Sequence, residues 1–149
     1  STKAEIAEIR EELNAGGYLK SPASKPKKAQ TPVLREYRSA EGYRIIVGKN
    51  NRQNDYITTT LAAKNDLWFH TKNIPGSHVV VMCGGKDVSD ETLIYAATLA
   101  AENSGAAAGA QVPVDYTPVK FVKKPNGAKP GMVIYTTNKT LYVTPNNGG

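Results

Sequence analysis

The stretch LWFHTKNIPGSHVVVM, residues 67–82, decides the fold class of this 149-residue chain. Its first residues alternate, which places Leu67 and Phe69 on one face of a strand and Trp68 and His70 on the other. Leu67 and Phe69 are the apolar choice for a core, so we expect Phe69 to be more buried than His70. The alternation therefore predicts a β-strand with one buried face.

A turn divides this stretch. Pro75-Gly76 carries Pro and Gly in the positions typical of a type II turn, and residues 78–82 form a second, β-branched run. We expect a β-hairpin in which His70 and His78 lie directly opposite each other and point to the same face. Protonation of one would then hinder protonation of the other.

The remaining elements lie on both sides of this hairpin. Strands are expected over residues 43–47, 119–122, 132–136 and 140–144, and a helix over residues 90–103. Residues 50–63 favour a second helix, and a strand over residues 56–60 is the alternative by propensity. We expect a tight hairpin turn at Asn138-Lys139. We also expect a rigid turn over residues 112–117, in which Asp115 accepts a hydrogen bond from Thr117. Helices segregated among mostly antiparallel strands predict an α+β domain.

One long packed helix is expected after Ser89. The Ser89 hydroxyl can cap it, Asp90 and Glu91 complement its dipole, and Gly105 is a good stop. The residues expected to pack on the sheet are Leu93, Ile94, Ala97, Ala100 and Ala101.

Composition outlines the domain organisation. Residues 1–19 carry a narrow apolar stripe typical of the end of a coiled-coil helix, and residues 20–32 are a basic Pro/Lys linker. Residues 33–146 form the expected folded domain, and residues 147–149 a tail. The first residue is Ser1, so we expect a processed start or a piece of a longer chain.

Several classes of function are excluded. No apolar run approaches the roughly 18 residues that a membrane-spanning helix needs. One cysteine forms no intrachain disulfide, which favours a reducing, cytoplasmic setting. One cysteine and two histidines do not make a structural zinc site, and we expect no metal and no cofactor.

The charge is basic and unevenly placed. The net charge is +6, and no acidic residue follows Asp115. The basic residues of that last part are Lys120, Lys123, Lys124, Lys129 and Lys139. Such a one-signed surface suggests a polyanionic partner; the alternative is a solvated surface that maintains solubility. The first four of these lysines are the candidate phosphate contacts.

A polar loop follows the strand at 43–47. Amides and the guanidinium fork suit contacts to phosphates, sugars and base edges. The candidate RNA-binding residues here are Lys49, Asn50, Asn51, Arg52 and Asn54. The stretch lacks the second glycine of a P-loop, and a helix-capping loop is the alternative.

The hairpin offers a second set of candidates. On a binding face, Trp68 would stack on a base and His70 would donate a hydrogen bond, with Lys72, Ser77 and His78 beside them. A hydrolase with Ser77 as nucleophile and a histidine base is an alternative, but no carboxylate is placed to orient either histidine. Two further alternatives to a binding face are a metal site and a purely structural pair of histidines.

Five motifs in this order resemble one known family. They are NNRQND at 50–55, DLWFH at 66–70, IPGSHV at 74–79, VPVDYT at 112–117 and KKPNGAKPG at 123–131. Together they resemble the NFACT-R domain, the C-terminal RNA-binding domain of the NFACT ribosome-quality-control factors, many of which are labelled fibronectin- or fibrinogen-binding proteins. The likeness extends over nearly the whole chain.

The resemblance implies a non-enzymatic module without catalytic residues. Its expected partners are tRNA, the RNA of the large ribosomal subunit and the remaining domains of a parent NFACT protein, which recruits alanyl-tRNA for template-free tailing of stalled nascent chains. An extracellular-matrix adhesin is the alternative that the older label suggests.

Overall fold

The computed structural model describes residues 33–145 of the chain. The coiled-coil end expected at 1–19, the linker at 20–32 and the tail at 147–149 lie outside the described residues, as does residue 146. Those parts of the domain organisation stay predictions.

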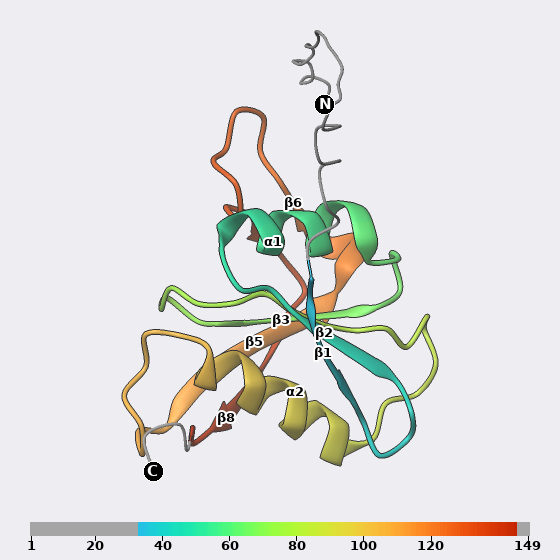
Figure 1. Ribbon diagram of the computed structural model, residues 1–149, viewed down its shortest axis with the longest axis vertical. Coiled ribbons are helices and arrows are strands. Elements are labelled where there is room, and N and C mark those ends of the chain that lie inside the picture. Colours follow the sequence, from blue (N-terminus) through green and yellow to red (C-terminus); the bar gives the residue numbers. More distant parts are fainter. Residues whose placement is uncertain (1–32, 146–149) are drawn as a thin grey trace, which may run out of the picture. The chain divides into compact units, whose positions relative to one another are not determined.

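An antiparallel sheet forms the centre of the described part (Figure 1). Its six strands, in spatial order, are β1 (Arg35–Arg38), β2 (Arg44–Val47), β4 (Val79–Val81), β3 (Leu67–Thr71), β5 (Val112–Pro118) and β8 (Lys139–Val143). A separate pair joins β6 (Val122–Lys123) to β7 (Ile134–Tyr135). The helical elements are α1 (Asn51–Tyr56), the π-helical turn η1 (Ile57–Leu61), α2 (Asp90–Glu102) and the 3₁₀ turn η2 (Val119–Phe121). The α+β class is confirmed.

The hairpin has the expected register. Strands β3 and β4 pair Phe69 with Val79, so the same register sets His70 opposite His78, and their ring centroids lie 5.4 Å apart. Phe69 is fully buried whereas His70 is partly exposed, as predicted.

Both faces of the sheet are covered, as Figure 1 shows. On one face α2 packs against a core that contains Phe69. On the other face α1, η1 and the β6–β7 pair cover a smaller core built around Trp68, Val80 and Ile57. Trp68 is therefore 0% exposed, although it lies opposite the main core.

Helix α2 begins as predicted. The Ser89 hydroxyl accepts a hydrogen bond from the Thr92 amide at 3.2 Å, and Glu41, from the turn between β1 and β2, accepts from the Ser89 amide at 2.7 Å. Small side chains at Ala97 and its neighbours let the helix approach the sheet closely. The prediction for Ile94 is wrong, since this side chain is 52% exposed on the outer side of the helix.

The prediction of a rigid turn at residues 112–117 is wrong, because this segment forms strand β5, which lies between β3 and β8. Pro113 is tolerated there because it lies at the end of the β3–β5 ladder, where its carbonyl accepts from the Lys72 amide at 2.9 Å. Asp115 does not accept from Thr117; it binds side chains of other elements instead.

Two further turns and one strand differ from expectation. Gly76 does not have the positive φ of a type II turn; the left-handed residue of the hairpin loop is Asn73, with φ 58°. Strand 119–122 is replaced by η2 and the short β6. A hairpin at Asn138-Lys139 is not formed, because β7 pairs with β6 whereas β8 pairs with β5.

Candidate nucleic-acid interface

The polar loop before α1 divides into buried and exposed residues. Asn50 caps the helix, its side-chain oxygen accepting from the Gln53 amide at 2.9 Å, as the helix-capping alternative proposed. Lys49, Asn51 and Arg52 are exposed. These three remain available to a ligand.

Asn54 and Ser77 lie inside the domain, where their hydrogen bonds are used. Asn54 Oδ1 accepts from the His78 amide at 3.0 Å, and its Nδ2 donates to the Gly76 carbonyl at 3.3 Å. The Ser77 hydroxyl donates to the Gly48 carbonyl. Asn54 thus ties α1 to the hairpin, and Ser77 ties the hairpin to the loop before α1.

His78 is also buried, with 2% exposure. Its Nδ1 lies 2.7 Å from the Thr58 hydroxyl of η1. Burial, with a smaller contribution from His70, lowers the pKa of His78 to about 3, so the imidazole is neutral at pH 7. His78 and Trp68 thus hold this face together and are closed to bulk solvent.

Asp115 organises the centre of the same face. It accepts from the hydroxyls of Tyr135 and Thr140 and pairs with Lys72, whose Nζ lies 3.0 Å from Oδ1. Burial alone raises the pKa of Asp115, but these three partners outweigh it and hold the pKa below its ordinary value. Lys72 therefore forms an ion pair with Asp115 that the sequence pattern did not predict.

A pocket of about 280 Å³, the polar pocket, opens on this face. Its lining includes these residues from the five motifs: Asn51, Asn54, Trp68, His70, Gly76, His78 and Gly131. The lining residues that lie outside the motifs are Asn73, Met132, Val133 and Tyr135. No pattern in the sequence connects Tyr135 with Trp68, because they meet only when β7 folds over the sheet.

Asp55 braces the loop that closes the polar pocket. Its Oδ1 lies 2.9 Å from Lys124 Nζ and accepts from the Gly131 amide at 3.1 Å. Gly131 has φ 83°, and a Cβ there would lie 3.3 Å from the Asn51 carbonyl oxygen. Glycine is therefore favoured where this loop meets α1, since any other residue would be strained there.

A second cavity, the lysine groove, has a volume of about 450 Å³. Lys64, Lys120, Lys123 and Lys124 line it above a partly apolar floor. Lys64 was missed because only the fold brings it here: the Lys120 amide donates to the Lys64 carbonyl at 3.0 Å. Val133 lines both cavities, so the groove and the polar pocket are neighbours. Lys129 is exposed but lines neither.

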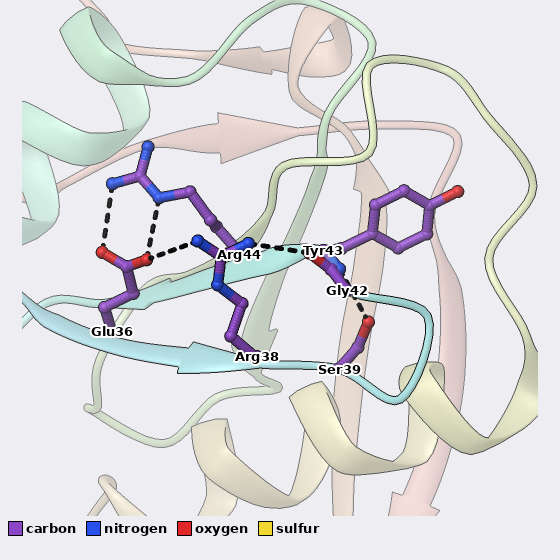
Figure 2. A network of polar contacts seen from close by, with 6 residues as sticks. All are labelled: Glu36, Arg38, Ser39, Gly42, Tyr43 and Arg44. Atoms are coloured by element: carbon purple, nitrogen blue, oxygen red, sulfur yellow. Dashed lines mark hydrogen bonds and ion pairs between the residues drawn. The ribbon is translucent and has the colours of Figure 1, made fainter.

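The arginines at the β1–β2 edge differ from these lysines, as Figure 2 shows. Arg44 binds Glu36 through both arms of its fork, at 2.9 and 3.1 Å. Arg38 approaches the same carboxylate at 3.8 Å and donates to the Gly42 carbonyl. Charge at this edge is partly neutralised, whereas within residues 33–145 Lys120 and Lys123 form no ion pair.

A serine-hydrolase arrangement has no support in this geometry. The Ser77 hydroxyl is bonded to a backbone carbonyl, and the His78 ring to Thr58. In the part of the chain that the structure describes, no carboxylate forms a hydrogen bond with either histidine ring, and no metal-binding cluster of His, Cys, Asp or Glu occurs.

Free lysines bind phosphates, whereas amides and aromatic rings bind base edges and faces. A groove of the first kind beside a pocket of the second is the arrangement expected of a nucleic-acid-binding α+β domain. Residues 33–137 match the family model described as the NFACT protein RNA binding domain. The chain belongs to this family.

Curated relatives agree. Proteins called "Rqc2 homolog RqcH" match over 144 residues: that of Bacillus subtilis is 53% identical (95% of this chain, 25% of the relative), that of Streptococcus suis 51% (95% and 26%) and that of Streptococcus pneumoniae 46% (96% and 26%). The chain thus spans about a quarter of their length.

A solved structure has the same fold. The C-terminal part of the fibronectin/fibrinogen-binding protein from Streptococcus suis is 46% identical, with a TM-score of 0.73, over 85% of this chain and 50% of that chain. The expected resemblance to the NFACT-R domain is confirmed by these matches.

Two asparagines of one motif are expected to behave differently. Asn54→Ala should lower the free energy of unfolding by about 2 kcal/mol, because it leaves buried backbone groups unpaired. Asn51→Ala, its exposed control on the same helix, should change stability by less than about 0.5 kcal/mol. Urea denaturation measures both; equal losses would contradict the division of the motif into a buried and an exposed half.

Proposed function

We propose that this domain binds tRNA, and RNA of the large ribosomal subunit, within a ribosome-quality-control factor. In that role the remaining domains of the parent NFACT protein act with it to recruit alanyl-tRNA for template-free tailing of stalled nascent chains. The family description and the names of the relatives support this assignment. The domain acts by binding, without catalysis or a cofactor, in the cytoplasm.

The lysine groove is the observation that carries the proposal. Lys64, Lys120 and Lys123 are exposed, and no carboxylate in the described chain neutralises them. Lys124 adds a fourth charge that it shares with Asp55. Unpaired ammonium groups around one concave surface suit successive phosphates of a nucleic-acid backbone. Among residues 33–145, no helix is long and apolar enough to cross a membrane.

The 149-residue chain is expected to bind tRNA with an affinity that falls as salt rises, since each phosphate contact releases counterions. With about 4–6 contacts, the slope of log K against log salt should be on the order of −3 to −5. Fluorescence anisotropy of labelled tRNA, recorded at salt concentrations from about 50 to about 300 mM, measures this slope. No binding at the lowest salt, or a flat response, would overturn the proposal.

A variant pair locates the binding surface. Lys120→Ala combined with Lys123→Ala should weaken tRNA binding roughly tenfold and reduce the slope by about 2. Lys124 is left in place because its loss would also unpair Asp55. Lys86→Ala combined with Lys139→Ala is the matched control, because it also removes two exposed charges and these lysines line neither cavity. An equal effect in the control would mean that charge matters only in total.

An adhesin is the second candidate, favoured by the description of the similar solved structure as a fibronectin/fibrinogen-binding protein. Immobilised fibronectin and fibrinogen should then capture the chain at physiological salt, and capture should survive the removal of the groove lysines. Capture of tRNA but of neither matrix protein supports the RNA assignment.

A further inference from the structure

We propose that the polar pocket takes one unpaired RNA base, while the phosphates of the same strand lie along the lysine groove. This inference rests on the proposed RNA-binding function and names the form of RNA: a single strand or an unpaired end, rather than a duplex.

Size favours a single base. The polar pocket has a volume of about 280 Å³, just below the usual range for sites of drug-sized ligands. A base inside a duplex is stacked on both faces and paired at its edge, so only an unpaired base is able to enter such a pocket.

The side chains that remain free suit a base edge. Within the described residues, neither the Asn51 nor the Asn73 amide forms a side-chain hydrogen bond. An amide offers a donor and an acceptor together, the pair that an adenine edge matches. The indole N–H of Trp68, also in the lining, is the one buried side-chain polar atom in the described part without a partner. Base nitrogens and carbonyl oxygens are acceptors for such a donor.

The rings of the lining suit a base face. His70 lies parallel to Trp68, with centroids 5.8 Å apart and an interplanar angle of 12°. The Tyr135 ring packs on Trp68 at 4.7 Å, and its hydroxyl is fixed by Asp115. Met132 is 60% exposed at the same pocket. A rigid aromatic stack with an adaptable thioether beside it suits stacking of a planar ring.

The two cavities form one path. Val133 belongs to the lining of both, so a strand whose base enters the polar pocket continues directly into the lysine groove. The amides and rings are on the pocket side and the ammonium groups on the groove side. This division matches the two sides of a single-stranded nucleotide chain, bases on one and phosphates on the other.

The single tryptophan of the chain makes the test direct, because fluorescence from Trp68 reports on the pocket. Adenosine 5′-monophosphate should quench it, whereas ribose 5-phosphate, which has no base, should not. An unpaired oligoadenylate should bind about tenfold more tightly than the same strand annealed to its complement. Thermal unfolding of each variant confirms that it is folded.

Two exposed positions test the contacts. Asn51→Ala and Met132→Ala should each weaken oligoadenylate binding roughly five- to tenfold, while Asn65→Ala, an exposed asparagine at another cavity, should leave it unchanged. Salt-dependent tRNA binding with no fluorescence change and no effect of either variant overturns the base pocket and leaves the proposed function intact. No RNA binding at all overturns both.

Discussion

Lowering the pH from 7 to 5 is expected to reduce the free energy of unfolding by about 2 kcal/mol, because His78 is neutral in the folded domain. Burial and, next, the neighbouring His70 lower its pKa from 6.5 to about 3. The unfolded chain takes up a proton near pH 6.5, so acid favours the unfolded state. Stability is complete above that pH and is lost progressively as the pH falls toward 3.

Urea denaturation at pH 7, 6 and 5 measures this loss. The chain has only two histidines, and ordinary carboxylates titrate mainly below pH 5, so the histidines dominate this window. His78→Gln should flatten the profile, at the cost of lower stability at pH 7. His70→Gln, the matched control on the opposite strand, should keep the larger part of the slope. An unchanged slope in His78→Gln would contradict the assignment.

Replacing Asp115 by alanine is expected to lower the free energy of unfolding by about 3 kcal/mol. The carboxylate is 1% exposed and serves the Tyr135 and Thr140 hydroxyls and the Lys72 ammonium group. Its loss leaves two hydroxyls without their acceptor and one cation without its partner. Because its folded pKa is held low, the stabilisation is present above about pH 4, the pKa of an unfolded aspartate, and lost below it.

Lys72→Ala separates the ion pair from the hydrogen bonds. Its side chain is 41% exposed, so the loss should be below about 1 kcal/mol. Guanidinium denaturation at pH 7 compares the two variants. A loss in Asp115→Ala no larger than in Lys72→Ala would show that the hydroxyl contacts contribute nothing. Because the Asp115 carboxylate fixes the Tyr135 hydroxyl, Asp115→Ala should also bind unpaired RNA more weakly than Lys72→Ala does.

These two predictions concern supporting residues of the interface. His78 joins the hairpin to η1, and Asp115 joins β5 to β7 and β8. The exposed residues above them, such as Asn51, have no such partners in the described chain. A motif that resembles a binding sequence thus contains two populations, one that builds the face and one that is free to bind.

Local chemistry made much of the fold predictable. Alternation over residues 67–71 settles which side chains share a face, since the side-chain period of a strand is two. Ser89 and the acidic residues after it mark the start of α2. The lysines after Asp115, with no acidic residue among them, predict a basic surface. Each of these depends only on neighbouring residues.

Other features depend on contacts between distant segments. Residues 112–117 were expected to be a turn because Asp115 can accept a hydrogen bond from Thr117 in an Asx-type turn, yet β3 and β8 on the two sides provide hydrogen-bond partners that make this segment strand β5. The prediction of a hairpin at Asn138-Lys139 is wrong for the same reason, because β8 pairs with β5 and β7 pairs with β6.

The sequence by itself determined the α+β class, the hairpin register that sets His70 against His78, and a basic surface typical of an RNA-binding module. Only the tertiary structure decided that Trp68 and His78 are buried and that Lys64 joins Lys120 in one groove. Periodicity tells which face of a strand a residue occupies, but not what covers that face. Here α1, η1 and the β6–β7 pair cover it, and burial follows from that second layer.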